Sequence, residues 1–175
     1  VPAPGEEGTI TVKEACELFF AAHDRKEIME RVSMTKTAAF VLEKMAQTER
    51  FCNAQLFGYI NDISKEEQSQ FSVVCVRLDD KSIYVSFSGT DNTIVGWREN
   101  FNMGYLSETP GQLKAVNYLN QIVHDDWKKI RVGGHSKGGN LSVYASVKCD
   151  RSIQKRIVKV YSNDGPGFNE EMIES

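Results

Sequence analysis

The stretch that most constrains the fold lies at residues 132–140 and has the sequence V-G-G-H-S-K-G-G-N. Apolar residues before it predict a short buried strand, and the residues after it predict a helix. Between the two stands the pattern Gly-x-Ser-x-Gly, made by Gly134, Ser136 and Gly138. This is the spacing of a nucleophile elbow, in which glycines leave room where a Cβ would clash and the serine hydroxyl projects from a strained backbone. The flanking strand and helix favour an elbow over a chance match in a glycine-rich loop.

The elbow predicts Ser136 as a catalytic nucleophile. The helix that begins after it directs its N-terminal N–H groups at developing negative charge, and the backbone N–H of Lys137 is then a natural oxyanion donor. His135 occupies the first x position, which points away from such a site, so we expect a packed core histidine there. A phosphate-binding loop is the alternative, but its Gly-x-x-x-x-Gly-Lys-[Ser/Thr] spacing is absent.

The remaining pattern predicts an α/β fold. Alternating and β-branched runs predict an antiparallel meander, with strands at 55–63, 71–78 and 82–89. After the meander, strands alternate with helices, which is typical of a mostly parallel sheet with right-handed crossovers. In this second part, helices are expected at 95–101, 113–129 and 141–147, and strands at 130–132 and 157–162.

A helical segment precedes the sheet. Thr11 and Glu14 have the spacing of a capping box, and apolar stripes predict helices at 11–23, 26–31 and 34–52, the last with Ser33 as its N-cap. We therefore divide the chain into a helical N-terminal segment, 1–52, which is a candidate cap over the site, and a core, 53–175. The two parts are expected to form one domain.

Composition narrows the function classes. The chain has 175 residues, of which 41% are hydrophobic and 26% charged, as in one soluble globular domain. A net charge of −3 gives no electrostatic basis for binding nucleic acid, and no apolar run approaches the roughly 18 residues of a membrane span. The cysteines Cys16, Cys52, Cys75 and Cys149 are scattered singly, which predicts free thiols in a reducing, cytoplasmic compartment. We expect no metal and no cofactor.

A second motif lies about 46 residues before the elbow serine. It has the sequence V-S-F-S-G-T-D at 85–91 and is followed by Trp97 and by the pair N-F at 100–101. With the G-H-S-K-G-G of the elbow, the chain resembles the class 3 (fungal-type) lipase branch of the α/β-hydrolases. Within that branch it is most similar to a bacterial family of uncharacterised lipase-like proteins. The resemblance covers roughly residues 71–168.

The resemblance implies an α/β-hydrolase-like fold and a serine lipase or esterase. In such lipases the residue after the motif glycine completes the oxyanion hole with its N–H and hydroxyl, and here Thr90 after Gly89 matches it. Asp91 and Trp97 belong to the same motif, whereas Ser88 stands where those lipases carry Arg. The alternative for Thr90 is a satisfied hydroxyl at the end of a strand.

The general base is missing from its expected place. The triad of α/β-hydrolases runs Ser, then Asp or Glu, then His along the chain, but His23, His124 and His135 all precede Ser136. We expect His23 and His124 at the surface. Asp164 follows the serine and is a weak candidate acid, with a turn-forming residue as the alternative. We therefore expect a fragment that is incomplete at the C-terminus, or a second chain that completes the sheet.

The leading interpretation is a serine hydrolase that cleaves a small-molecule or lipid ester through Ser136, with Thr90 and Lys137 as oxyanion donors. Two alternatives stay open. One is a catalytically inactive, hydrolase-like binding module, which the missing histidine favours. The other is an acyltransferase or thioesterase that uses the same nucleophile.

Overall fold

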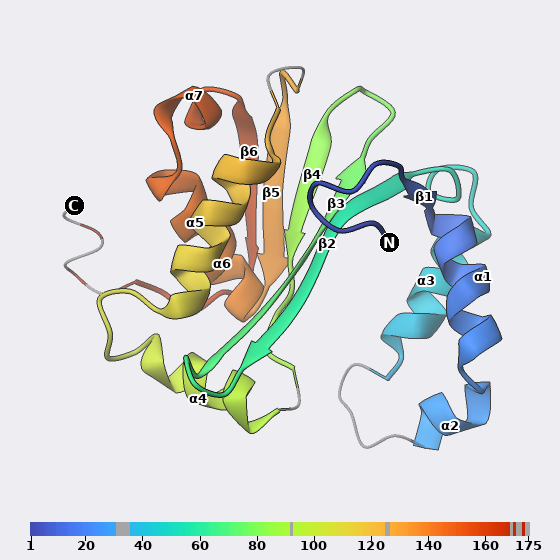
Figure 1. Ribbon diagram of the computed structural model, residues 1–175, viewed down its shortest axis with the longest axis horizontal. Coiled ribbons are helices and arrows are strands. Elements are labelled where there is room, and N and C mark those ends of the chain that lie inside the picture. Colours follow the sequence, from blue (N-terminus) through green and yellow to red (C-terminus); the bar gives the residue numbers. More distant parts are fainter. Residues whose placement is uncertain (31–35, 92, 125–126, 169, 171–172, 174–175) are drawn as a thin grey trace.

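One six-stranded sheet is the frame of the molecule. The computed structural model describes residues 1–30, 36–91, 93–124, 127–168, 170 and 173. Within these residues, seven helices accompany an open sheet whose strands lie side by side in sequence order, a mixed α/β architecture (Figure 1). The strands are β1 (Ile10–Thr11), β2 (Gln55–Ser64), β3 (Ser69–Arg77), β4 (Ile83–Phe87), β5 (Ile130–His135) and β6 (Ile157–Asn163).

The sheet has an antiparallel half and a parallel half. Neighbouring strands from β1 to β4 pair antiparallel, whereas β4–β5 and β5–β6 pair parallel. The predicted meander is therefore confirmed. The expectation of a mostly parallel sheet is wrong, since three of the five pairings are antiparallel. The third antiparallel pairing comes from β1, a strand of two residues that is too short to produce an alternating pattern.

The turn between β3 and β4 follows local chemistry. The chain reverses at Lys81, which takes a left-handed φ of 60°. The Asp80 carboxylate accepts hydrogen bonds from the backbone N–H and the hydroxyl of Ser82 and pairs with Arg131 in β5 at 2.9 Å. This contact holds the start of β5 beside the start of β4, so both parallel strands end at the same edge of the sheet, where ligand sites form in α/β folds.

Two helices cover one face of the parallel half. α5 (Pro110–Ile122) and α6 (Lys137–Lys148) pack against each other and against the sheet (Figure 1). α5 begins and ends before the predicted boundaries. Thr109 and Gln112 form a capping box that starts the helix at Pro110. The buried core between sheet and helices includes Phe71, Val73, Cys75, Val85, Phe87, Leu119, Val132, Leu141 and Ala145. Of the two remaining helices, α4 (Ile94–Asn102) packs against β3, and the short α7 (Arg151–Gln154) precedes β6.

The N-terminal helices are present, and the third is shorter than predicted. α1 (Val12–Ala22) begins at the expected capping box, in which the Glu14 N–H donates to Thr11 Oγ1 at 3.1 Å and the Thr11 N–H donates to the Glu14 carboxylate at 2.8 Å. α2 (Arg25–Glu30) and α3 (Ala38–Ala46) follow. Turns replace the predicted helix at 47–52, and the predicted N-cap Ser33 lies outside the described residues.

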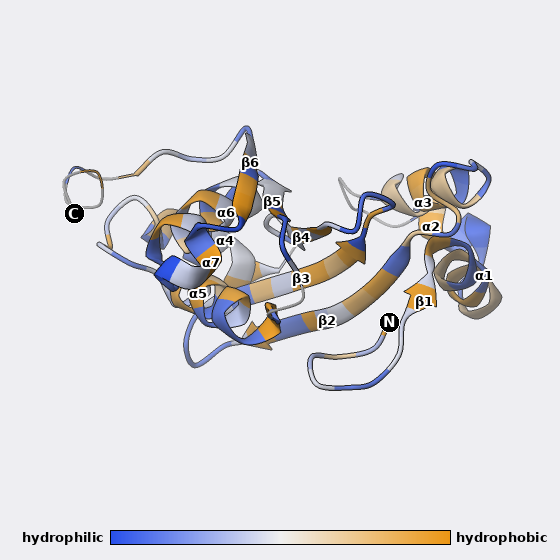
Figure 2. Ribbon diagram, turned by 90° about the horizontal axis from the view of Figure 1, so that it is seen from above, coloured by the Kyte–Doolittle hydropathy of each residue, from blue (hydrophilic) through white to orange (hydrophobic). Residues whose placement is uncertain are grey.

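The second face of the sheet is only partly covered. Side chains alternate between the two faces along a strand, so Val85 of β4 is buried under α5 and α6 whereas Tyr84 and Ser86 point to the other side. On that side the helices α1, α2 and α3 gather near β1, at the opposite end of the molecule from α5, α6 and α7 (Figure 2). Across the described ranges, no helix combines the length and apolarity that crossing a membrane would need.

Candidate active site

Ser136 sits at a sharp turn between β5 and α6, as the elbow motif predicts. Its backbone has φ 54° and ψ −127°, a combination that residues other than glycine rarely adopt. The Ser136 N–H donates to the carbonyl of Asn163 at the end of β6 (2.8 Å), which ties the turn to the neighbouring strand. Such strain persists only where the surrounding structure enforces it, and it clusters at functional sites.

Two glycines make this turn sterically feasible. A Cβ on Gly134 would lie 2.5 Å from the carbonyl oxygens of Gly138 and Phe87, and a Cβ on Gly138 would lie 2.9 Å from the carbonyl carbons of Phe87 and Ser88. Real Cβ atoms do not come within 3.0 Å of such atoms. Both motif glycines are therefore required for the close approach of the elbow to the end of β4.

The Thr90 loop lies directly against the elbow. A Cβ on Gly89 would be 3.7 Å from Ser136 Cβ, so the loop that follows β4 passes Ser136 at contact distance. The Thr90 hydroxyl is buried and has no hydrogen-bond partner. Buried hydroxyls nearly always have a partner, so the alternative for Thr90, a satisfied hydroxyl at the end of a strand, is not what the structure has.

Asp91 and Thr93 fix the shape of the same loop. The Asp91 carboxylate accepts hydrogen bonds from the N–H (2.9 Å) and the hydroxyl (2.6 Å) of Thr93. Thr93 in turn caps α4, because its Oγ1 accepts the Gly96 N–H at 3.0 Å. Asp91, which the sequence predicted as part of the motif, thus acts on the loop geometry.

The first residue of α6 carries a fully buried charge. Lys137 Nζ lies 2.7 Å from Glu99 Oε2, and neither side chain is exposed to solvent. Burial lowers the pKa of the Lys137 ammonium, while the Glu99 carboxylate acts in the opposite direction. The sequence predicted a role for the Lys137 backbone N–H only. Its side-chain partner, Glu99, lies 38 positions away along the chain, so no local sequence pattern could reveal the ion pair.

α4 carries an exposed apolar stripe beside the Thr90 loop. Gly96 and Glu99 form its buried side. The opposite side presents Ile94, Trp97 and Phe101, which are 74%, 48% and 70% exposed. Trp97, predicted as a supporting residue of the second motif, therefore lies at the surface rather than in the core.

The expectation for His135 is wrong, because its side chain is exposed. It is the last residue of β5, and the strand pleat turns its side chain to the poorly covered face of the sheet. His23 is half-buried and stacks on Phe19 (4.6 Å between ring centroids), and His124 is exposed beside Trp127 (5.4 Å). The described ring contacts thus place His23 and His124 away from the elbow.

Asp164 lies in the turn that follows β6. It is exposed and takes a left-handed φ of 53°. The next residue, Gly165, approaches the elbow so closely that a Cβ on Gly139 would lie 3.1 Å from its Cα. The turn therefore runs beside the start of α6, held there by Asn140, whose Nδ2 donates to the carbonyls of Pro166 and Gly167 (3.1 and 3.2 Å). A role for Asp164 as the acid stays a prediction.

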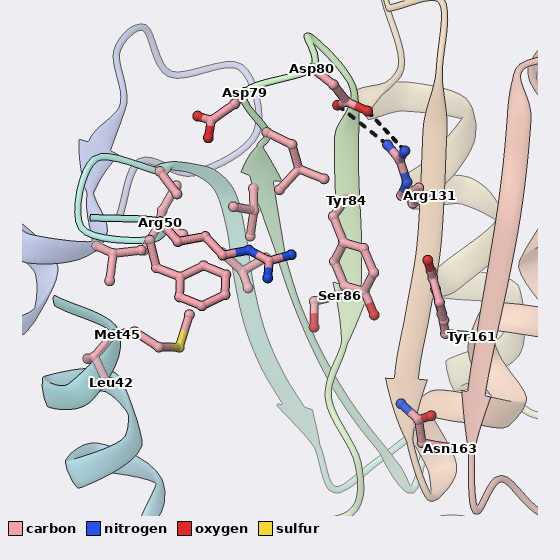
Figure 3. Close-up of a pocket in the computed structure, with 17 residues that line it drawn as sticks. Leu42, Met45, Arg50, Asp79, Asp80, Tyr84, Ser86, Arg131, Tyr161 and Asn163 are labelled. Atoms are coloured by element: carbon pink, nitrogen blue, oxygen red, sulfur yellow. Dashed lines mark hydrogen bonds and ion pairs between the residues drawn. The ribbon is translucent and has the colours of Figure 1, made fainter. Parts of the chain in front are cut away.

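A pocket of about 800 Å³ lies on the poorly covered face, away from the α5–α6 layer (Figure 3). Leu42 and Met45 of α3 form one wall, and Tyr84 and Tyr161 of the sheet form the floor. Arg50 extends toward Tyr84 across the space between them (Figure 3). Val12 at the start of α1 also lines the pocket, so α1 and α3 face the sheet across it. The role of the N-terminal helices as a cap over the elbow stays a prediction.

A sequence model of the Mbeg1-like family matches residues 45–175, which is more than half of the chain. The chain belongs to the Mbeg1-like family. We found no match among curated proteins and none among solved structures.

In this member of the Mbeg1-like family, the matched region contains the elbow, the second motif at 85–91 and every strand of the sheet except β1. The helices α1 and α2 and most of α3 lie before it. The match begins within α3, and the division of the chain into a helical N-terminal segment, 1–52, and a core, 53–175, stays a prediction.

Sequence reasoning missed three buried polar side chains around the candidate site of this chain. Glu99 and Gln70 contact Lys137, and Gln112 of α5 donates to Asn140 Oδ1 at 2.8 Å. Each looks like an ordinary surface residue in its local sequence. Only their burial marks them, and burial depends on how distant segments pack.

Proposed function

We propose that this protein is a serine hydrolase that cleaves carboxylic esters with Ser136 as its nucleophile. The observation that carries the proposal is the backbone conformation of Ser136, φ 54° and ψ −127°, at a strand-to-helix turn that two glycines make possible. A nucleophile elbow needs this strain because it sets the hydroxyl apart from its neighbours at the end of a strand. The proposal includes an α/β-hydrolase-like arrangement of the sheet, which the order of the two motifs supports.

Two groups are suited to stabilise the oxyanion. Lys137 is the first residue of α6, and the first N–H groups of a helix have no partner within it. Thr90 lies beside the nucleophile and has a buried hydroxyl without a partner. In the proposed reaction, Ser136 Oγ attacks the ester carbonyl carbon and the carbonyl oxygen becomes an oxyanion held by these donors. The proton of the Ser136 hydroxyl passes to a general base and from it to the departing alkoxide, so the alcohol leaves and an acyl-enzyme remains. Water that gives a proton to the same base then hydrolyses the acyl-enzyme to the acid, and the base returns the proton to Ser136 Oγ.

The apolar stripe of α4 supports an apolar substrate. Ile94, Trp97 and Phe101 expose large side chains next to the proposed oxyanion loop, and exposed apolar patches of this kind mark binding surfaces. We infer an ester with a hydrocarbon acyl chain, of the lipase or esterase class.

A second candidate function is a non-catalytic binding module. It is favoured by the histidines, because His23 and His124 contact aromatic rings elsewhere and the side chain of His135 points to solvent. A serine hydrolase needs a base within hydrogen-bond reach of its nucleophile. The two candidates predict opposite outcomes in a labelling experiment.

The test is labelling by a fluorophosphonate probe, applied to the 175-residue chain and to the full-length gene product and read by intact mass and peptide mapping. Labelling at Ser136 that is lost in Ser136→Ala supports the hydrolase. Ser88→Ala is the matched control, since Ser88 is an exposed serine beside the same loop and should leave labelling unchanged. Labelling only in the longer protein would place the base outside residues 1–175. Absence of labelling in both folded proteins would favour the binding module.

Ester turnover then defines the reaction. p-Nitrophenyl esters of increasing chain length measure hydrolysis, and product analysis with added alcohols or thioesters separates hydrolysis from acyl transfer and thioester cleavage. A turnover that persists in Ser136→Ala would overturn both the hydrolase and the acyltransferase.

A further inference from the structure

The buried side chain of Lys137 uses all of its hydrogen-bonding capacity. Its ammonium donates to Glu99 Oε2 (2.7 Å), to Gln70 Oε1 (2.7 Å) and to the backbone carbonyl of Gln70. An ammonium has three N–H donors, so the group is fully satisfied. These three acceptors replace the water molecules that would solvate the ammonium at the protein surface.

Glu99 gathers three separate elements around that ammonium. Its Oε2 also accepts the backbone N–H of Gln70 at the start of β3 (3.0 Å), and its Oε1 accepts the N–H of Gly111 in the first turn of α5 (2.9 Å). The approach to α5 is close, since a Cβ on Gly111 would lie 3.1 Å from the Glu99 carboxyl carbon. The carboxylate on α4 is thereby fixed from several sides.

Gln70 extends the cluster to the oxyanion loop. Its Oε1 accepts the backbone N–H of Asp91 (3.3 Å) as well as the Lys137 ammonium. Asp91 follows Thr90 directly, and Lys137 follows Ser136 directly. One amide oxygen therefore connects the segment that carries one proposed oxyanion donor to the residue that carries the other.

Stability alone does not explain such a cluster. Removing two charges from water costs several kcal/mol per ion, and well-packed apolar residues often replace a buried ion pair at no loss. A charged cluster does provide directional contacts that fix the elements it joins. Here those elements are α4, α5, the Thr90 loop and the elbow.

We propose that Lys137, Glu99 and Gln70 are positioning residues that set the distance and angle between the two oxyanion donors, Thr90 and the Lys137 N–H. This inference rests on the proposed function, because it assigns a role within the same site. It predicts that loss of the cluster slows attack by Ser136 and leaves substrate binding unchanged. The oxyanion hole would then depend on a charge pair that never contacts the substrate.

The experiment uses Lys137→Met, Glu99→Gln and the double variant, in whichever form of the protein carries the labelling activity. Removal of one oxyanion donor typically slows turnover about 10²–10³-fold, so we expect each single variant to label at least tenfold more slowly, with kcat lowered and KM unchanged. Lys114→Met is the matched control. Lys114 forms a half-exposed ion pair with Asp62 at 2.6 Å, and its loss should leave the labelling rate unchanged.

The double variant separates positioning from stability. It removes both charges together, so no unpaired charge stays buried, and its thermal midpoint should recover toward that of the native protein. Under the proposal its labelling rate stays low. A rate that returns with stability, or single variants that fold and label at the native rate, would overturn the inference and leave the proposed function intact.

A second measurement does not depend on activity. Hydrogen exchange of the Asp91 amide, which donates to Gln70 Oε1, should accelerate in the folded double variant and stay at the native rate in Lys114→Met. Unchanged exchange would show that the cluster does not hold the loop. If the native protein neither labels nor turns over esters, the proposed function fails, whereas the exchange result still decides whether the cluster positions the Thr90 loop.

Discussion

The elbow region and the N-terminal helices both contain an ion pair and a capping box, but their side chains are buried to very different extents. α6 has eight buried residues, whereas α3 has none. Each region contains an ion pair: Lys137–Glu99 is fully buried, and Arg25–Glu43 has side chains that are 56% and 23% exposed. Each region also contains a capping box, at Thr109–Gln112 and at Thr11–Glu14. The comparison shows that the local sequence sets the geometry of an ion pair or a cap, whereas burial sets how much stability the protein loses without it.

The largest expected effect comes from glycines of the elbow region. In Gly138→Ala the new Cβ would lie 2.9 Å from backbone carbons of Phe87 and Ser88, which cannot move without displacing β4. We expect the variant to lose its cooperative unfolding transition, measured by circular dichroism during urea titration. Gly167→Ala is the control, since no atom lies within 4 Å of the site of its Cβ. Equal stability of the two variants would contradict the steric account of the elbow.

The two ion pairs give the next largest contrast. Lys137→Met leaves the Glu99 carboxylate buried without its counter-charge and should lower the free energy of unfolding by about 3–5 kcal/mol. Arg25→Met removes an exposed partner and should leave the urea midpoint unchanged within error. Similar losses in both variants would show that burial is not what distinguishes the two regions.

The capping boxes sharpen the comparison further. Thr11→Ala should destabilise the protein by about 1 kcal/mol, the usual value for a lost cap. Thr109 is fully buried, so Thr109→Ala also leaves the N–H of Gln112 without its acceptor in a buried site, and a loss of about 2 kcal/mol is expected. Differential scanning calorimetry of both variants measures the difference. A larger loss in Thr11→Ala would reverse the ranking.

The smallest effect is a pH dependence at the turn before β4. Hydrogen bonds from Ser82 and the Arg131 guanidinium hold the pKa of Asp80 at about 2, below its ordinary value of 3.8. A carboxylate with a lowered pKa stabilises the fold above the unfolded pKa, so this contribution is present above about pH 4 and is lost as the pH falls toward 2. In Asp80→Asn the thermal midpoint should therefore fall less steeply between pH 4 and pH 2 than in the native protein. If the thermal midpoints of the two proteins fell in parallel with pH, Asp80 would not contribute to the pH dependence.

Local sequence was sufficient for the elements and for the elbow. The meander, the α1 capping box and the position of Ser136 all follow from patterns within a few residues, and the structure confirms them. The ends of the helices were less predictable. α3 ends at Ala46, although the pattern of apolar residues predicts a helix up to residue 52. The orientation of His135 depended on which face of the sheet is covered. That property belongs to the packing of distant helices rather than to the strand itself.

No local sequence pattern could predict the buried cluster of Lys137, Glu99 and Gln70 beside the Thr90 loop. Gln70 lies 67 positions before Lys137, and the two meet only because β3 and α6 flank the same end of the core. Lysine, glutamate and glutamine are normally surface residues, so their types argue against burial. The sequence could therefore indicate the strained turn at Ser136 and the glycines around it, but not the polar contacts that hold them.

The hydrogen bond from Ser136 to Asn163 has a consequence for the order of folding. The elbow adopts its strained conformation only when three strands are in place: β5 carries it, β4 packs against Gly138, and β6 supplies the carbonyl of Asn163. The last of these strands ends 27 positions after the serine. A chain in which β6 has not joined the sheet lacks the Asn163 carbonyl that the Ser136 N–H contacts, so we expect Ser136 to take its native conformation only after that strand has docked. A serine probe would then react only with protein in which β6 is docked, and would report on one of the last steps of folding.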